Sequence, residues 1–484
     1  MACSLGISPV IDVCASSHVP SGASQIIDHS FASFSFPGHF FFDYSGNRSH
    51  PNLFSRDILD LLHDKTGTPP HIRVGGTSAD HIIYNASQEI PVFLSNSSDN
   101  GIPDEVYVGP SWFEGFQNFP GSLWTFQVAL RGTIENAVAE AQLCMDHARE
   151  FLVAFEIGNE PDIAVEQGTV PKDYTMSDYV DEWLQYADAI SENVLQVYAS
   201  HDHEGFSVAG AFDDGIDDTG HVKSISQHQY NLGDPPTINR QDDFMNHHAI
   251  VGNLSQYQHE INFIRSYDPP MKYVMGETNS DYVNLNMAQY EGVLGSALWL
   301  ADYMLYGMTR NISNMNIIQG TTFGYAGWVP VPYAGRDPHV RAPLYGHILV
   351  ADTVGHHPSV QVSEVDLGLR NFSAYAIYES EKLAKYVLVN FDEWNATTPY
   401  PRPQQEVNLA APGGNRTQTA TVKRLFGAGA SADSGISWGG QSWNYTDGRL
   451  AVTGDEHHEK LSFKDGQARL MIASTEAVLV TLDK

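Results

Sequence analysis

Short apolar runs alternate with amphipathic stretches along the first 350 or so residues of the chain. The apolar runs are bounded by Gly or Pro, which is typical of strands, and helical spacing follows most of them. The pattern predicts strands at residues 31–36, 71–76, 123–130, 151–158, 206–212, 223–230, 272–276 and 313–319, and helices at 57–63, 135–150, 176–199 and 292–306. Eight strands, most of them separated by helical segments, predict an α/β fold of the (β/α)8 TIM barrel type.

The helical period disappears after about residue 355. Short strand-like runs follow, separated by Gly, Pro, Asn and Asp, at residues 360–367, 374–378, 386–390, 405–409, 419–425, 461–464, 468–472 and 477–482. This pattern predicts a C-terminal antiparallel β-sandwich domain. A further strand near Val10 is expected to join it, so the predicted division is 1–25 with the sandwich, 26–354 as the barrel and 355–484 as the sandwich.

The fourth predicted strand ends in a carboxylate. Its apolar run stops at Gly158, and Asn159 and Glu160 follow just before Pro161, which cannot donate to a strand ladder. Side chains at the C-terminal ends of barrel strands are where barrel enzymes place their chemistry. The alternative is that Glu160 only caps the following loop, so a second carboxylate is needed to decide.

The seventh predicted strand supplies that carboxylate, because it breaks at Gly276 and presents Glu277. Two Glu side chains on opposite strands of a barrel match the acid/base and nucleophile of a retaining glycoside hydrolase. The sixth strand ends with His228 and Tyr230, which are expected to lie beside Glu277 and to distinguish its environment from that of Glu160. The alternative is that both are core residues with satisfied hydrogen bonds.

Charge excludes several classes of partner. The 484 residues carry a formal net charge of −32 with 26 Lys and Arg, which disfavours nucleic acids, heparin-like polyanions and anionic membranes, although a local basic pocket stays possible. The longest apolar stretch, residues 293–305, is interrupted by Asp302 and is too short for a membrane span. A monomer is favoured.

Sequons are two to three times as frequent as chance pairing would give, which predicts a secreted glycoprotein. The first residues lack the basic and apolar regions of a signal peptide, so such a peptide is expected to have been removed or never present. Cys3, Cys14 and Cys144 allow one disulfide at most. The candidate glycosylation sites are Asn47, Asn85, Asn96, Asn253, Asn311, Asn371, Asn395, Asn415 and Asn444.

Other polar clusters give weaker indications of function. The acidic stretch 213–218 could bind Ca²⁺ but lacks the EF-hand spacing and is better explained as a solvated loop. Three adjacent His pairs, at 247–248, 356–357 and 457–458, lack metal-ligand spacing, and no nucleotide-binding glycine motif is present. No cofactor and no metal are expected.

The two Glu motifs, with the sequence Gln-His-Gln-Tyr ending at Tyr230 and the glycine pair at 75–76, resemble the signatures of glycoside hydrolase family 79. This family of retaining barrel enzymes includes β-glucuronidases and heparanase. The resemblance covers essentially the whole chain. It implies that Glu160 is the general acid/base, that Glu277 is the nucleophile, and that Asn159 donates to the 2-hydroxyl of the sugar.

The resemblance also implies a pocket for the carboxylate of glucuronic acid. The family holds this group with a Tyr five residues after the nucleophile, nearby backbone amides and a second Tyr, which correspond here to Tyr282 and Tyr325; Thr77 matches a Thr of the same pocket. Parts of the family have glycines where this chain has Val283 and Asn284, which implies a tighter pocket.

The predicted function is therefore that of a retaining exo-β-glucuronidase that removes terminal glucuronic acid, with or without a 4-O-methyl group, from glycans. A heparanase-like endo-β-glucuronidase is the first alternative, and it predicts an open cleft lined by Lys and Arg. A non-catalytic carbohydrate-binding protein is the second, and the intact pair of Glu residues argues against it.

Overall fold

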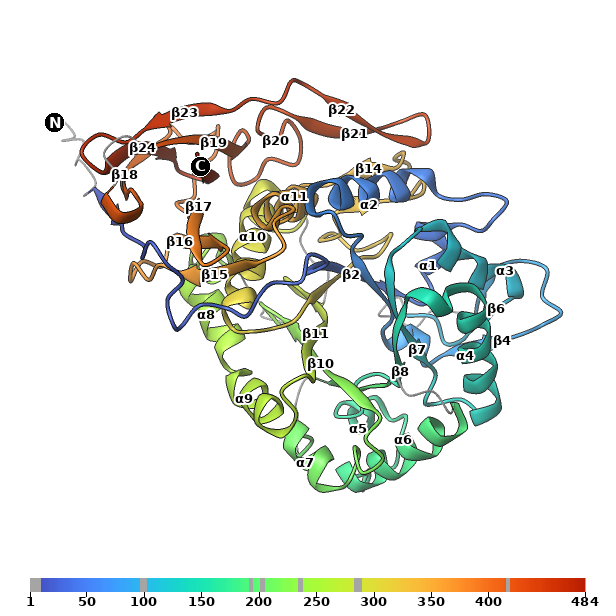
Figure 1. Ribbon diagram of the computed structural model, residues 1–484. Coiled ribbons are helices and arrows are strands. Elements are labelled where there is room, and N and C mark those ends of the chain that lie inside the picture. Colours follow the sequence, from blue (N-terminus) through green and yellow to red (C-terminus); the bar gives the residue numbers. More distant parts are fainter. Residues whose placement is uncertain are drawn as a thin grey trace.

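The computed structural model describes residues 10–95, 102–190, 195–200, 205–233, 238–282, 290–414 and 418–483. Figure 1 shows a large barrel surrounded by helices, with sheets formed by the last third of the chain packed against one side. Within the described residues, no helix is both long enough and apolar enough to cross a membrane.

Eight parallel strands close the barrel, which confirms the predicted fold. Each strand pairs with two neighbours, and β12 pairs with β2 to complete the circle. The strands are almost wholly buried, and several, such as β10, carry polar side chains among the apolar ones. In order around the barrel they are β2 (Ala32–Pro37), β3 (His71–Gly75), β7 (Leu123–Val128), β8 (Leu152–Ile157), β9 (Leu195–Ser200), β10 (Val222–Tyr230), β11 (Lys272–Asn279) and β12 (Met315–Ile318).

Helices cover the outside of the barrel (Figure 1). Several of them begin at side-chain caps, since Asn52 accepts from the Ser55 amide, Thr133 from the Asn136 amide and Asn246 from the His248 amide. The helix that carries Asp302 is buried on every side because the C-terminal sheets cover its outer face. The main helices are α2 (Leu53–Thr66), α4 (Ile134–Ala148), α6 (Met176–Ile190), α8 (His247–Ser255), α9 (Gln258–Tyr267), α10 (Leu294–Thr309) and α11 (Pro343–Val354).

The fifth βα unit differs from its prediction. The helix predicted over residues 176–199 ends at Ile190, and Leu195–Ser200 is the fifth barrel strand. The strand predicted at 206–212 is helix α7 (Val208–Asp213), which begins at a cap where Ser207 accepts from the Gly210 amide. Helical and strand-like apolar patterns run into each other here without an intervening Gly or Pro, so periodicity alone places the boundary wrongly. The two errors cancel, and Glu160 and Glu277 keep their places after the fourth strand and on the seventh.

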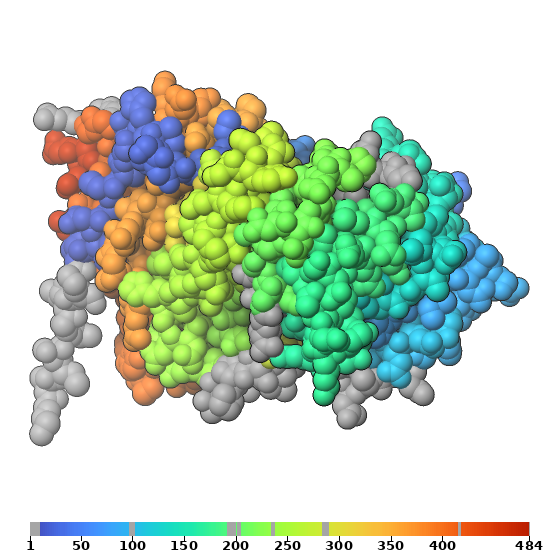
Figure 2. All heavy atoms as spheres, turned by 90° about the horizontal axis from the view of Figure 1, so that it is seen from below, coloured from blue at the N-terminus to red at the C-terminus, as the bar shows by residue number. Residues whose placement is uncertain are grey.

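The sandwich consists of two sheets around a separate apolar core that includes Val13, Leu388, Leu409, Ile472 and Val480. In the smaller sheet, β1 (Ile11–Val13) pairs in parallel with β18 (Gln404–Ala410), which also pairs with β24 (Gln467–Ala473). The larger sheet contains β15 (Val360–Glu364), β16 (Phe372–Glu379), β17 (Lys382–Asn390), β25 (Glu476–Leu482), β19 (Thr419–Phe426), β20 (Ser437–Trp438) and β23 (Glu459–Ser462). Figure 2 shows N-terminal residues in blue against the orange segments of the sandwich. The proposed domain boundaries stay a prediction.

Several short helices and strands lie outside the barrel strands and the two sandwich sheets, and they were not predicted. They are α1 (Phe41–Ser45), α3 (Pro110–Phe113), α5 (Ala164–Gln167), the sheet of β4 (Ile82–Tyr84), β6 (Val106–Val108) and β5 (Val92–Leu94), and the antiparallel pairs β13 (Trp328–Val329) with β14 (His339–Val340) and β21 (Ser442–Thr446) with β22 (Arg449–Thr453).

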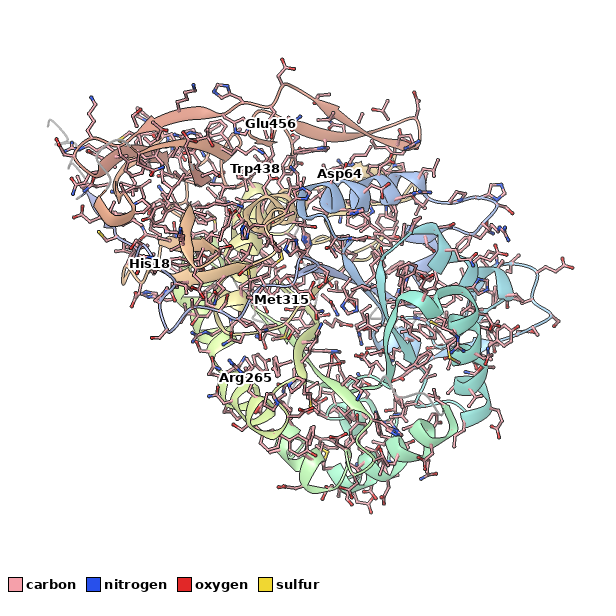
Figure 3. All side chains as sticks on the ribbon, in the orientation of Figure 1. His18, Asp64, Arg265, Met315, Trp438 and Glu456 are labelled. Atoms are coloured by element: carbon pink, nitrogen blue, oxygen red, sulfur yellow. The ribbon has the colours of Figure 1, made fainter. Side chains whose placement is uncertain are left out.

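Two carboxylates join the barrel to the sandwich, one fully buried (Asp302) and one partly buried (Asp352). Asp302 on α10 accepts hydrogen bonds from His247 on α8 (2.7 Å) and from Ser373 (2.5 Å) and Tyr375 (2.7 Å) on β16. Asp352 on α11 pairs with Lys65 of α2 and Lys423 of β19, and it also accepts from the indole of Trp438, labelled in Figure 3. We call this region, where α8, α10 and α11 meet β15, β16 and β19, the barrel–sandwich junction.

Candidate active site

Glu160 is positioned by an unusual turn at the end of β8. Gly158 has φ +78° and packs against Leu130, where an added Cβ would come within 2.6 Å of a side-chain atom, so only Gly fits. Glu160 itself adopts φ +48°, a conformation that costs energy for a residue with a Cβ. The turn directs the largely buried carboxylate of Glu160 toward the barrel axis. A strained backbone of this kind is typical of functional sites.

Glu277 lies within β11, opposite His228 in the register with β10. The preceding Gly276 packs against Ser226, whose Oγ would lie 1.9 Å from an added Cβ, which explains the glycine in this strand. The Tyr230 hydroxyl donates to Glu277 Oε1 at 2.5 Å. Burial and the neighbouring Glu277 raise the pKa of Tyr230 well above its usual value, so it stays a donor.

Arg73 holds the other oxygen of Glu277. It is fully buried on β3, donates to Glu277 Oε2 at 2.7 Å, and also donates twice to Glu156, at 2.8 and 2.5 Å. Burial opposes the charge of Arg73, but the two carboxylates raise its pKa above the usual value. Glu277 therefore accepts one charge-assisted hydrogen bond and one from a phenol, which together fix the position of its carboxylate.

Glu160 has a different partner, the Nδ1 atom of His228 at 2.8 Å. Both His228 and Tyr230 lie beside Glu277, as the sequence predicted, but Tyr230 is hydrogen-bonded to Glu277, whereas His228 is hydrogen-bonded to Glu160. One carboxyl is therefore bound by a guanidinium and a phenol, and the other by an imidazole. The two carboxyl groups therefore have different surroundings, as an acid/base and a nucleophile require.

A carboxylate oxygen of Glu160, one of Glu277 and a ring nitrogen of His228 all lie within 4.8 Å of one another. This spacing fits a retaining glycosidase, whose carboxyl groups are about 5 to 5.5 Å apart, and is too short for an inverting one. Three such atoms could also ligate a metal. However, Glu277 already has a guanidinium on one oxygen and a phenol on the other, so the charge that a metal ion would neutralise is compensated.

Asn159 is held between three neighbours. Its backbone amide donates to Asp80 at 3.1 Å, its Oδ1 accepts from Arg73 at 2.9 Å, and its Nδ2 lies 3.4 Å from Thr77 Oγ1. Burial raises the pKa of Asp80 to about 6, against the lowering effect of the Leu130 amide and other donors. Because Oδ1 faces Arg73, the amide group of Asn159 is oriented with its NH₂ toward Thr77.

The two tyrosines of the predicted carboxylate pocket differ in exposure. Tyr282 is 57% exposed and packs edge-on against Tyr230 at 5.9 Å, whereas Tyr325 is buried. Burial, and then the nearby Glu277, Asp281 and Glu291, raise the pKa of Tyr325 well above its usual value. Asn284 lies outside the described residues, as do Asn96, Asn415 and Cys3.

The remaining sequons lie on the surface to different degrees. Asn85 and Asn444 are exposed, while Asn47, Asn253, Asn311, Asn371 and Asn395 are half-buried. The amide of Asn253 donates to Asn231, which leaves it less free for a glycan. Glycosylation at these positions stays a prediction.

Sequence reasoning gave no role to Arg73, Glu156, Gln127, Asp80 or Glu291. A signal was present for Glu156, a charge inside an otherwise apolar barrel strand that requires a buried partner. Arg73 stands at the same depth in β3 and is that partner. The Gln127 side chain accepts from Arg73 at 3.1 Å and from the Gly76 amide at 2.7 Å, and nothing in its sequence context indicates this.

Known proteins share this architecture. Residues 374–479 match the Glycosyl hydrolase family 79 C-terminal beta domain. In overall structure, the chain resembles a 4-O-α-L-rhamnosyl-β-D-glucuronidase from Fusarium oxysporum, with TM-score 0.83 at 23% identity over 97% of this chain and all of that one. It also resembles a family 51 α-L-arabinofuranosidase from Bifidobacterium longum, with TM-score 0.63 at 11% identity over 98% of this chain and all of the other. At these identities the likeness establishes the fold.

Sequence relatives extend the comparison. A β-glucuronidase from Aspergillus niger is 31% identical over 470 residues, covering 89% of this chain and 86% of that protein. A β-glucuronidase from Neurospora crassa is 30% identical over 486 residues, covering 87% of this chain and 86% of that protein. With such relatives over most of its length, the chain belongs to glycoside hydrolase family 79, as the motifs around Glu160 and Glu277 predicted.

Proposed function

We propose that the protein is a retaining exo-β-glucuronidase that hydrolyses terminal β-linked glucuronic acid from glycans. The single observation that carries the proposal is the pair of carboxylates, Glu160 and Glu277, within 4.8 Å of each other and with unlike partners. The choice of sugar follows the two fungal relatives that are β-glucuronidases.

In the first step, Glu277 attacks the anomeric carbon while Glu160 gives its proton to the glycosidic oxygen. The bond from carbon to the leaving group breaks as the bond to the Glu277 oxygen forms, which yields a glucuronyl ester. In the second step, Glu160 takes a proton from water, and the water oxygen displaces Glu277. Two inversions leave the product in the β configuration.

The neighbours of each Glu support these roles. Arg73 and Tyr230 hold Glu277 in place and stabilise the anion that must attack. They also lie where negative charge returns to Glu277 when the ester is hydrolysed, so they assist both steps. His228 orients Glu160, and Asn159 is assigned to the 2-hydroxyl of the sugar.

We assign Tyr282, Tyr325 and Thr77 to the carboxylate of the sugar, with Asn284, which follows Val283 just after Tyr282 in sequence. Tyrosines are suited to this task because they donate without adding a cation near the positively charged transition state. The protein is proposed to be secreted, glycosylated and monomeric, to act without a cofactor, and to bind neither nucleic acid nor membranes.

The test uses a nitrophenyl β-D-glucuronide and the matching β-D-glucoside. We expect hydrolysis of the glucuronide, with the β anomer as the first product seen by ¹H NMR, and little hydrolysis of the glucoside. Formation of the α anomer first would refute the retaining mechanism, and a preference for the glucoside would refute the carboxylate pocket. Cleavage inside a heparan sulfate chain would instead support the endo-acting alternative.

A further inference from the structure

A cavity of about 740 Å³ lies where the rim of the barrel meets the sandwich. Its barrel side consists of the residues just before α10, the strand β14 and the start of α11, and its sandwich side includes the loop at 431–436 and the strand β21. Cavities of about 300 to 1,000 Å³ are the size that binds small ligands. This volume accommodates one or two sugar units.

Two arginines lie at this cavity in an otherwise acidic protein. Arg336 and Arg341 line it, together with His339, whose pKa burial lowers, and the exposed Asp433, although the chain as a whole carries a net charge of −32. Arg341 is 7% exposed, and its Nη1 donates to the Phe323 carbonyl, but its Nε has no hydrogen-bond partner among the described residues. Burial, and then the like charge of Arg336, lower the pKa of Arg341, and nearby Tyr44 and Glu291 counter this only in part.

Arg341 differs in this respect from the other deeply buried arginine. Arg73 has Glu156 and Glu277 within hydrogen-bond distance, whereas no carboxylate in the described parts of the chain forms an ion pair with Arg341. A buried cation without a partner is costly, and a bound anion would remove that cost. The unsatisfied Nε therefore indicates a ligand that carries negative charge.

The one buried acid on the wall does not fill this role. Glu291 lines the cavity, and burial and then the neighbouring Asp281 raise its pKa. Both effects disfavour its anionic form, so Glu291 is a poor counter-ion for Arg341.

The rest of the wall suits a sugar. Trp443 and Tyr345 pack edge-to-face at 5.6 Å, and the Trp443 amide donates to the Tyr345 hydroxyl at 3.1 Å, which fixes both rings. Ser442 and Asn444 add polar groups that can bond hydroxyls. Aromatic rings beside hydroxyl-binding side chains favour a carbohydrate over a simple inorganic anion.

We propose that this cavity is a second binding site for a uronate sugar, with Arg336 and Arg341 as its carboxylate-binding residues and Trp443 as its aromatic wall. The choice of a uronate rests on the proposed function, because glucuronic acid is the acidic sugar that such an enzyme meets both in its substrate and as its product. The site would hold either a second uronate unit of the glycan or the released sugar.

The test measures ligand binding through the ¹⁹F NMR signal of Trp443. The protein is labelled with 5-fluorotryptophan, the Trp443 ¹⁹F signal is identified by its loss in Trp443→Phe, and D-glucuronate is titrated in. We expect the signal to shift with D-glucuronate but not with D-glucose. Arg336→Ser, at an exposed position that leaves folding intact, and Arg341→Gln should each weaken binding at least about ten-fold.

Arg265→Ser is the matched control, since Arg265 is an exposed arginine on α9 (Figure 3), a helix that contributes no residue to the cavity lining. It should leave the titration unchanged. A Trp443 signal that does not respond to D-glucuronate, or that responds equally in the Arg336→Ser and Arg341→Gln variants, overturns the proposal. Tighter binding of a glucuronate-containing disaccharide than of the free sugar identifies the glycan as the ligand, and equal binding identifies the product. Nitrophenyl glucuronide hydrolysis, measured on the same samples, tests the proposed function separately.

Discussion

The mouth of the barrel and the barrel–sandwich junction both bury charged side chains, yet they are built differently. At the mouth, Glu160 has a strained backbone and stands within 4.8 Å of a second carboxylate. At the junction, Asp302 is fully buried and accepts from His247, Ser373 and Tyr375 in a regular helix and strand. The mouth keeps its charges close and reactive, whereas the junction neutralises them to hold two parts of the chain together.

This difference predicts two kinds of response to substitution. At the mouth, removal of a side chain should abolish or reduce activity with little loss of stability, because strained and like-charged groups contribute little to folding. At the junction, removal should reduce stability and leave the chemistry unchanged, because it leaves a buried partner unsatisfied.

Glu277→Ala should have the largest effect on activity. Without the nucleophile no glycosyl ester can form, so kcat should fall about 10⁴-fold or more. The thermal midpoint should stay near the wild-type value, and added azide, a small external nucleophile, should restore part of the rate. Unchanged turnover in this variant would refute the assignment of the nucleophile.

Glu160→Ala should have the second largest effect on activity, and the size of that effect should depend on the leaving group. Loss of a general acid costs about 10²- to 10⁴-fold when the leaving group needs a proton. Hydrolysis of a substrate with an alkyl or sugar aglycone should therefore slow more than hydrolysis of a nitrophenyl substrate. Comparison of kcat/KM for the two substrate types measures this, and an equal loss for both would contradict the acid role.

Tyr230→Phe should have a moderate effect. It removes the 2.5 Å hydrogen bond to Glu277 while keeping the ring against Tyr282. A hydrogen bond to a charged group contributes about 1.5 to 3 kcal/mol, so kcat/KM should fall about 10- to 100-fold. Tyr267→Phe is the control, because Tyr267 is an exposed tyrosine on α9 whose ring contacts lie among surface residues.

His247→Gln should leave turnover nearly unchanged and reduce stability in a pH-dependent way. Burial would lower the pKa of His247, but Asp302 and Glu364 raise it to about 10. Since the folded pKa exceeds the unfolded value of about 6.5, the contribution is complete below pH 6.5 and is lost as pH rises toward 10. The difference in free energy of unfolding between wild type and His247→Gln should shrink from pH 6 to pH 10; a constant difference would contradict the charged pair.

Much of this organisation was predictable from local signals. Gly and Pro at strand ends, together with alternating apolar periods, located seven of the eight barrel strands and placed Glu160 and Glu277 on the fourth and seventh. The fifth strand was missed because helical and strand patterns merge between Ile190 and Leu195 without a break. Asp302, an acid inside an apolar helix, was visible in the sequence, but its partners on β16 lie about 70 residues away.

What the sequence by itself determined is therefore the set of elements, the barrel, and the two carboxylates at its mouth, because each depends on periods and breaks within a few residues. Only the tertiary structure decided that His228 binds Glu160 while Tyr230 binds Glu277, that Arg73 holds two carboxylates, and that Arg341 forms no ion pair with a carboxylate of the described residues. The physical reason is the distance along the chain over which each interaction acts. Strand and helix patterns follow from neighbouring residues, whereas ionic and hydrogen-bond partners depend on side-chain direction across a closed barrel, where Arg73 and Glu277, 204 residues apart in sequence, come within 2.7 Å.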